Sequence, residues 1–262
     1  MNVSGSAVVI TGAGSGIGAA MARAFAAAGA EQVVVADLNG EAAGAVAREI
    51  GGVAEELDVA DAPAVDRLVA RTVARLGRID VFCANAGVAS ETGLDSSDEA
   101  WRRAFDVNVM GHVYAARAVI PPMVERGSGY FVATASAAGL LVNPGDAPYT
   151  ASKHAAVGFA EWLAVTYGGS GIGFSVVCPM GVATPMLLEA LRDGVPAARA
   201  VADSGGIITP DHVAQAVLAG IADERFLILP HPEVATYWMR KAADPERWLS
   251  GMRRLSARSA GS

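Results

Sequence analysis

The chain has 262 residues, of which 52% are hydrophobic and 18% charged, so it can bury a sizeable core and is not a disordered chain. Its net charge is −7 and it has no basic tract, so phosphate-directed binding of nucleic acid is not expected. Its two cysteines, Cys83 and Cys178, exclude a disulfide framework by count and favour a reducing, cytoplasmic setting. No segment resembles a signal peptide or membrane span, and the four histidines lack metal-like spacing, so neither a membrane nor a metal is expected.

Short apolar segments rich in β-branched residues alternate with helical periods along the chain. Strands are expected at residues 7–11, 32–37, 53–57, 79–84, 129–136, 173–179 and 226–230. One long helix is expected from about residue 97 to residue 126. This alternation predicts a single α/β domain in which a seven-stranded parallel sheet is covered by helices on both faces. Ligands of such sheets bind beyond the carboxyl ends of the strands.

A glycine-rich turn follows the first expected strand. Residues 11–18 read TGAGSGIG, spaced T-G-x-x-x-G-x-G, and such a turn brings backbone and a helix N-terminus close to a pyrophosphate. Asp37, after the second strand, can bind the ribose hydroxyls of an adenosine and would repel a 2′-phosphate. Neither Ser15 nor Leu38 is basic, so the pattern favours NAD over NADP. The competing interpretations are a plain strand-to-helix turn and a helix-capping Asp37.

Polar residues also follow the later strands. Asp58 could bind the adenine amino group while Val59 packs on the ring, although a plain helix-entry role for Asp58 is equally open. Asn85 can bridge strands by hydrogen bonds, and Thr184 could hold a carboxamide. Tyr149 and its neighbour four residues on, Lys153, would share one face of a helix.

Taken together, these segments resemble the short-chain dehydrogenase/reductase family. The matching residues are the glycine turn at 11–18, Asp37, DV at 58–59, NAG at 85–87, NVMG at 108–111, Ser136, YTASK at 149–153 and PMGVAT at 179–184. The match covers roughly residues 5–230 and implies a single-domain Rossmann fold spanning residues 1–262.

The resemblance implies specific site residues. Its catalytic tetrad falls on Asn108, Ser136, Tyr149 and Lys153. Its cofactor contacts fall on Gly12, Ser15, Gly16, Ile17, Gly18, Asp37, Leu38, Asp58, Val59, Asn85, Ala86, Gly87, Tyr149, Lys153, Pro179, Val182 and Thr184. Met180 departs from the family's usual glycine, and we interpret it as a residue of the substrate pocket, with a packing role as the alternative.

The tetrad implies a reaction. Tyr149 as phenolate would take the hydroxyl proton of a secondary alcohol, and Lys153 and a positive nicotinamide would lower its pKa. Ser136 would position the substrate oxygen. Asn108 would hold a water beside Lys153, and its place inside a helix, where asparagine is not favoured, supports a functional role.

Specificity is expected in a lid at about residues 185–210 and a C-terminal tail at about residues 231–262, which would cover the pocket or a neighbouring subunit. A bulky apolar alcohol or ketone would contact Ala138, Asn143, Met180 and Met186. The alternative is that the apolar residues of the lid only pack the lid onto the rest of the domain.

The resemblance implies a homodimer or homotetramer. The leading function is an NAD-dependent alcohol dehydrogenase; the alternatives are an NADPH-dependent carbonyl or 3-oxoacyl-thioester reductase and a non-catalytic NAD(H)-binding regulator.

Overall fold

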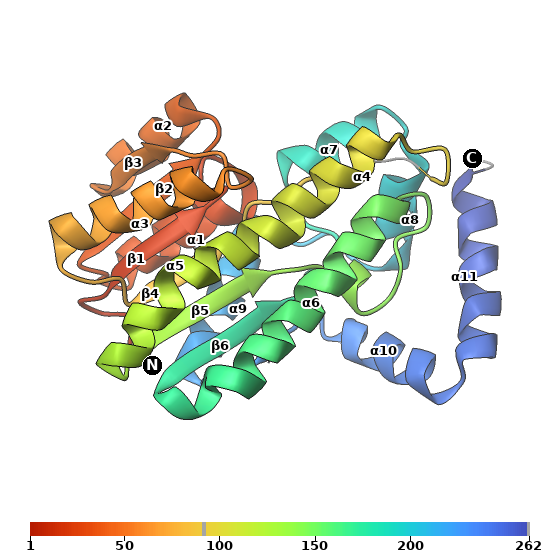
Figure 1. Cartoon of the computed structure of the whole chain (residues 1–262). Coiled ribbons are helices and arrows are strands. Elements are labelled where there is room, and N and C mark those ends of the chain that lie inside the picture. The colour runs from red at the N-terminus through yellow and green to blue at the C-terminus, as the bar shows by residue number, and fades with distance from the viewer. Residues whose placement is uncertain (91–92, 261–262) are drawn as a thin grey trace.

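Seven parallel strands form one sheet in the order β3-β2-β1-β4-β5-β6-β7 (Figure 1). The computed structural model describes residues 1–90 and 93–260. The strands are β1 Ala7–Thr11, β2 Gln32–Asp37, β3 Val53–Glu56, β4 Val81–Ala84, β5 Gly129–Thr134, β6 Ile172–Val177 and β7 Leu227–Ile228. The predicted α/β fold with a seven-stranded parallel sheet is therefore confirmed.

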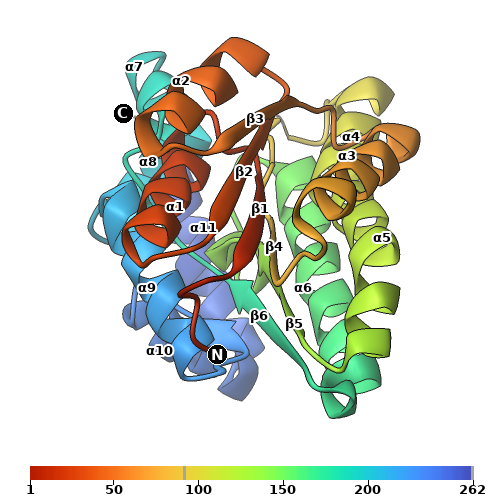
Figure 2. The same ribbon diagram turned by 90° about the vertical axis from the view of Figure 1, so that its left-hand side faces the viewer.

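Helices cover both faces of the sheet (Figure 2). They are α1 Gly16–Ala27, α2 Gly40–Ile50, α3 Ala62–Leu76, α4 Asp98–Phe105, α5 Gly111–Arg126, α6 Ala147–Tyr167, α7 Pro185–Arg192, α8 Pro196–Ser204, α9 Pro210–Ala222, α10 Glu233–Ala243 and α11 Pro245–Ala260. Apolar side chains of α1, α2 and α9 pack on one face, and those of α3, α5 and α6 pack on the other.

The two core layers follow from the alternation of side chains along each strand. In β1, Val8 and Ile10 join the layer under α1, whereas Val9 joins the layer under α3 and α5. Because both faces are covered, the strand is apolar up to its last residue, Thr11, and every one of its residues is buried.

The long helix predicted up to residue 126 is not one regular α-helix. A π-helical turn, Asp106–Met110, separates α4 from α5. A π-turn adds one residue to the helical repeat and is frequent at functional sites. This turn contains Asn108, whose side chain is fully buried, so the unusual residue and the unusual helix coincide.

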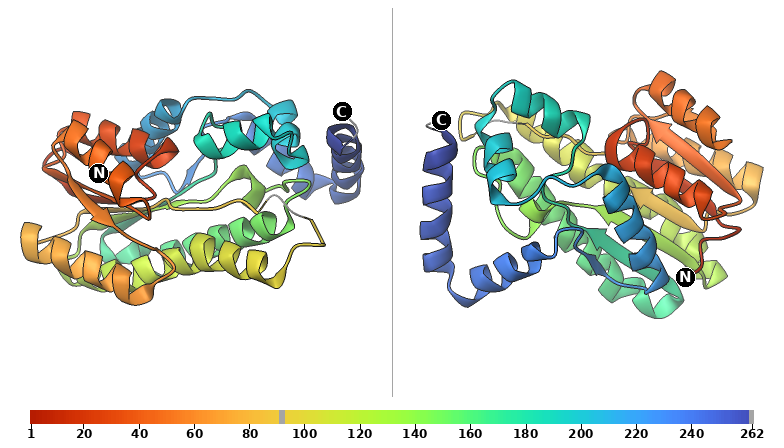
Figure 3. Two further views of the ribbon diagram at one scale, coloured as in Figure 1. Left: turned by 90° about the horizontal axis from the view of Figure 1, so that it is seen from above. Right: turned by 180° about the vertical axis from the view of Figure 1, so that it is seen from behind.

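The predicted lid and tail are helical. Residues 185–210 contain α7 and α8, and the tail contains α10 and α11. Helix α11 stands at one end of the molecule beside α8, joined to the body through α10 (Figures 1 and 3). Residues 261–262 of the predicted tail lie outside the described residues. In the described ranges, every helix is too short or too polar to cross a lipid bilayer.

Candidate active site

The carboxyl ends of the strands open into a cavity of about 1100 Å³. Every residue predicted to touch cofactor or substrate lines this cavity, and so do Ser136, Tyr149 and Lys153. Asn108 belongs to the predicted tetrad but does not line the cavity. Further lining residues come from the lid and from the tail.

The glycine turn at the base of the cavity has no room for larger residues. Gly12 has a φ of +63°, and a Cβ there would lie 2.7 Å from the Cα of Ala86. A Cβ on Gly18 would collide with the carbonyl oxygen of Gly12. The turn therefore presents bare backbone at the start of α1, which is the cradle that a pyrophosphate needs.

Hydrogen bonds lock this turn to the loop after β4. The hydroxyl of Thr11 accepts from the backbone N–H groups of Asn85 and Ala86 at 3.0 and 3.2 Å. The side-chain amide of Asn85 donates to the carbonyl oxygens of Thr11 and Gly12 at 3.0 and 3.3 Å. Asn85 thus bridges β1 and β4 and holds the floor of the cavity.

Asp37 lies at the rim of the cavity with its carboxylate held by backbone. One oxygen accepts from the N–H of Gly14 at 2.8 Å and the other from the N–H of Asn39 at 2.9 Å. A fixed negative charge beside the glycine turn suits a ribose diol and repels a 2′-phosphate. Asp58 also lines the cavity, and its carboxylate accepts from the N–H of Ala60 at 2.9 Å, as a helix-entry residue would.

Tyr149 sits in the first turn of α6 because Asp146 caps that helix. The carboxylate of Asp146 accepts the N–H of Tyr149 at 3.1 Å. Lys153, one turn further on, places its Nζ 5.6 Å from the centroid of the Tyr149 ring and donates to the carbonyl oxygen of Thr134 at 3.1 Å. Burial lowers the pKa of Lys153 to about 8.

The electrostatics of Tyr149 differ from the expectation. Burial raises the pKa of its phenol, and the negative charge of Asp146 adds to that rise. A hydrogen bond with Ser136 acts in the opposite direction and favours the phenolate. The expected fall in the pKa of Tyr149 is therefore not produced by the protein's own groups, because removal from water outweighs the help of Ser136.

The side chain of Asn108 forms hydrogen bonds with other protein groups and does not line the cavity. Its amide nitrogen donates to the carbonyl oxygen of Val88 at 2.9 Å and to the hydroxyl of Ser152 at 3.0 Å, while its oxygen accepts from the N–H of Val88 at 2.9 Å. Ser152 in turn donates to the carbonyl oxygen of Tyr149 at 3.0 Å. Asn108 therefore joins the β4 loop to the turn of α6 that carries Tyr149.

Sequence reasoning missed three buried polar residues around this site. Ser152 lies inside the stretch YTASK and was not singled out as a functional residue. Asp146, which also binds the hydroxyl and N–H of Ser90, was detectable as an acid preceding the helix-starting Pro148. His112 is buried, neither ring nitrogen has a partner among the described residues, and burial together with the charge of Lys153 lowers its pKa to about 3; no spacing rule indicated it.

Comparisons with known proteins agree with this site. The family model described as short chain dehydrogenase matches residues 6–193. The chain is 37% identical over 242 residues to a 1-deoxy-11-beta-hydroxypentalenate dehydrogenase of Streptomyces exfoliatus, covering 89% of this chain and 86% of the relative. It is 36% identical over 231 residues to a 2,5-dichloro-2,5-cyclohexadiene-1,4-diol dehydrogenase of Sphingobium indicum, covering 85% and 92%.

A solved structure extends the similarity to three dimensions. The short chain dehydrogenase/reductase of Burkholderia phymatum, in complex with NAD, matches with a TM-score of 0.83 and 32% identity over 94% of this chain and 96% of its own. The predicted resemblance, the dehydrogenase class and NAD as cofactor are confirmed, and neither alternative function is favoured. The chain belongs to the short-chain dehydrogenase/reductase family, whose members are oxidoreductases that use NAD(H).

Proposed function

We propose that this protein oxidises a secondary alcohol, or reduces the corresponding ketone, with Tyr149 as the general base or acid. The observation that carries this proposal is the meeting of Tyr149, Ser136 and Lys153 in the same cavity as the glycine turn and Asp37. A pyrophosphate cradle, a ribose-binding acid and a proton-transfer group are the parts that a nicotinamide-dependent dehydrogenase needs.

The residues present fit NAD. Glycines stand where a Cβ would fill the cradle, and a Cβ on Gly87 would lie 3.1 Å from the Nζ of Lys153, so the backbone leaves room beside the lysine. We assign the adenosine ribose to Asp37, the pyrophosphate to the turn from Gly12 to Gly18, and the nicotinamide end to Thr184 and its neighbours. NAD, when bound, supplies the hydride acceptor.

In the oxidation direction the hydroxyl proton of the substrate passes to the phenolate of Tyr149, and bound NAD would accept the hydride from the carbon that carries this hydroxyl. Ser136 orients the substrate oxygen and stabilises the phenolate by its hydrogen bond. Lys153, protonated below its pKa of about 8, adds a positive charge beside the ring. A base of this kind contributes about 10²–10⁴-fold to the rate. Asn108 does not line the cavity, and its role is to position the turn of α6 that carries Tyr149.

For the substrate we propose an apolar skeleton. The lining contributed by Ala138, Met180 and Met186 is apolar, and Asn143 adds a polar group on the facing loop. The relatives named above are dehydrogenases of a hydroxypentalenate and of a cyclohexadiene diol, which supports a hydroxyl on a carbon skeleton larger than a simple alcohol.

We further propose that residues 185–210 act as a lid over the cavity and that the chain forms a homo-oligomer. We also propose a cytoplasmic setting, where its two cysteines would stay reduced.

Replacing Tyr149 tests this function. Tyr149→Phe should lower turnover by at least about 10²-fold, because it removes the proton-transfer group, while NADH still binds. Turnover is followed by absorbance at 340 nm with NAD⁺ or NADP⁺ across a panel of secondary alcohols, and binding by NADH fluorescence. Turnover that survives in the variant would contradict the role of Tyr149. Tight NADH binding by the wild type without turnover of any alcohol would favour a regulator.

A further inference from the structure

The C-terminal tail carries a charge opposite to that of the whole chain. Residues 231–262 contain six basic and three acidic side chains, a net charge of +3 in a chain whose total is −7. Four of these basic residues line the cavity: Arg240 from α10, and Arg247, Arg254 and Arg258 from α11. The nucleotide end of the same cavity holds Asp37 and Asp58 instead. The tail therefore contributes four arginines and one acid, Asp244, to the cavity, whereas the nucleotide end contributes acids.

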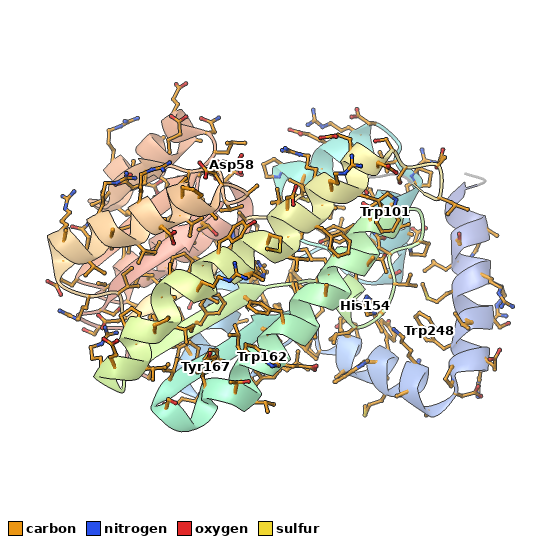
Figure 4. All side chains as sticks on the ribbon, viewed as in Figure 1. Asp58, Trp101, His154, Trp162, Tyr167 and Trp248 are labelled. Atoms are coloured by element: carbon orange, nitrogen blue, oxygen red, sulfur yellow. The ribbon has the colours of Figure 1, made fainter. Side chains whose placement is uncertain are left out.

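Helix α11 presents two adjacent stripes to the cavity. Trp248, Met252 and Leu255, at helical spacings of four and three, are half-buried and form the apolar stripe. The neighbouring stripe is basic and carries Arg247 and Arg254 seven residues apart. Figure 4 shows Trp248 projecting from α11 toward the body of the molecule, on the side where His154 of α6 lies.

The position of α11 is set by the loop that follows Ser136. The Nζ of Lys241 donates to the carbonyl oxygens of Leu140 and Leu141 at 2.8 and 3.1 Å, and it lies 5.1 Å from the centroid of the Trp248 ring. The tail is therefore fastened to the loop that follows Ser136, a predicted catalytic residue, and this contact fixes which part of the cavity the exposed arginines line.

Three of these arginines, Arg240, Arg247 and Arg254, differ from the arginines of the protein that are held in ion pairs. Arg23, for comparison, pairs with Glu49 at 2.8 Å. Within the part of the chain that the structure describes, no ion pair is found for Arg240, Arg247 or Arg254, and Arg254 donates only to the hydroxyl of Ser250 at 2.9 Å. Guanidinium groups that lie beside apolar side chains and are not neutralised by a carboxylate are suited to an anionic ligand.

Resting on the proposed alcohol oxidation, we propose that the substrate carries a carboxylate at the end remote from its hydroxyl. The apolar stripe of α11 binds the skeleton, and Arg247 and Arg254 bind the carboxylate. Because both arginines are exposed, the gain is modest and sensitive to salt: about tenfold in affinity at low ionic strength, and less at 0.5 M salt.

The test uses secondary alcohols of the form CH₃CH(OH)(CH₂)ₙCOO⁻ of increasing length, each compared with its neutral methyl ester. The wild type should favour acid over ester in kcat/KM by about tenfold once the chain is long enough to reach α11. Arg247→Glu and Arg254→Glu should bring that acid-to-ester ratio to about one or below. Arg253→Glu is the matched control, since Arg253 is exposed on the same helix but does not line the cavity; its ratio should equal that of the wild type.

A ratio at or below one at every length in the wild type overturns the proposal, and so does an equal loss in Arg253→Glu. Binding of the same acids and esters to the NADH complex of Tyr149→Phe, measured by calorimetry, separates this outcome from failure of the proposed reaction. Acids that bind more tightly than esters there, without any turnover in the wild type, support the carboxylate site and contradict the reaction. Charge reversal at Arg247 or Arg254 could instead change the size of the assembly in sedimentation and leave the acid-to-ester ratio unchanged. In that case the basic stripe is a subunit contact and the proposal fails.

Discussion

Lys153 shows how burial and function oppose each other at a single residue. Its ammonium is almost fully removed from solvent, donates to the backbone carbonyl of Thr134, and faces the ring of Tyr149. Desolvation disfavours the charged form, so the site holds its lysine at a cost in stability. Burial likewise disfavours the charged form of Tyr149, its phenolate, and so raises the pKa of that group.

A pH titration of stability measures the cost of Lys153. The folded state releases the proton of this residue near pH 8, whereas the unfolded state releases it near 10.5. Between these values the unfolded state binds more protons, so the free energy of unfolding rises with pH. In urea unfolding of the cofactor-free protein, we expect the wild type to gain stability from pH 8 to pH 10 relative to Lys153→Met. Parallel pH profiles for the two proteins would contradict this prediction.

At the scale of elements, the start of α6 is the junction on which the site depends. Asp146 caps this helix and also binds the hydroxyl and the N–H of Ser90, which lies in the loop after β4. Asn108, in the π-turn, ties the same loop to the same helix through Val88 and Ser152. Two independent sets of hydrogen bonds therefore hold α6 against the β4 loop, and Tyr149 lies at their meeting point.

Removing this buried cap should be costly. We expect Asp146→Ala to lower the free energy of unfolding by about 2–4 kcal/mol, because a helix cap is lost and the partly buried donor groups of Ser90 lose their acceptor. Asn39→Ala, which removes the exposed cap of α2, is the control and should cost about 1 kcal/mol. Urea unfolding compares the two variants, and equal losses would show that the contacts to Ser90 contribute little.

At the scale of the whole molecule, one lysine connects the tail to the loop that follows Ser136. Lys241 joins α10 to the carbonyl oxygens of Leu140 and Leu141 and stacks against Trp248 of α11. Because the two helices of the tail have this common anchor, the position of α11 over the cavity depends on it.

Loss of this anchor should loosen the tail without unfolding the domain. We expect Lys241→Met, which keeps an apolar side chain of similar reach, to speed hydrogen exchange of the amides in residues 245–260 about tenfold. Exchange in the strands should stay unchanged. Arg253→Met is the control on α11, away from this anchor. Unaltered exchange in α11 would mean that its packing against α8 suffices to hold it.

The sequence was sufficient for the sheet and for the chemistry at its edge. Apolar β-branched strands alternate with helical periods, and the parallel order of such units brings all their carboxyl ends to one side. The glycine turn, Asp37 and the Tyr149–Lys153 pair could be placed there because each depends on local spacing. The boundaries of the strands differed by at most two residues at either end, and the shortest strand is β7, where only Leu227 and Ile228 pair.

The tertiary structure alone decided which residues far apart in the sequence are in contact. The amide of Asn108 meets Ser152 across 44 positions, Ser90 meets Asp146 across 56, and Lys241 meets Leu140 across 101. No local periodicity encodes such pairs, since they arise only when the packed helices bring these side chains together. For the same reason, the direction of the pKa shift of Tyr149 and the arginines of α11 along the cavity followed from burial and position, whereas the groups proposed to react could be named from the sequence alone.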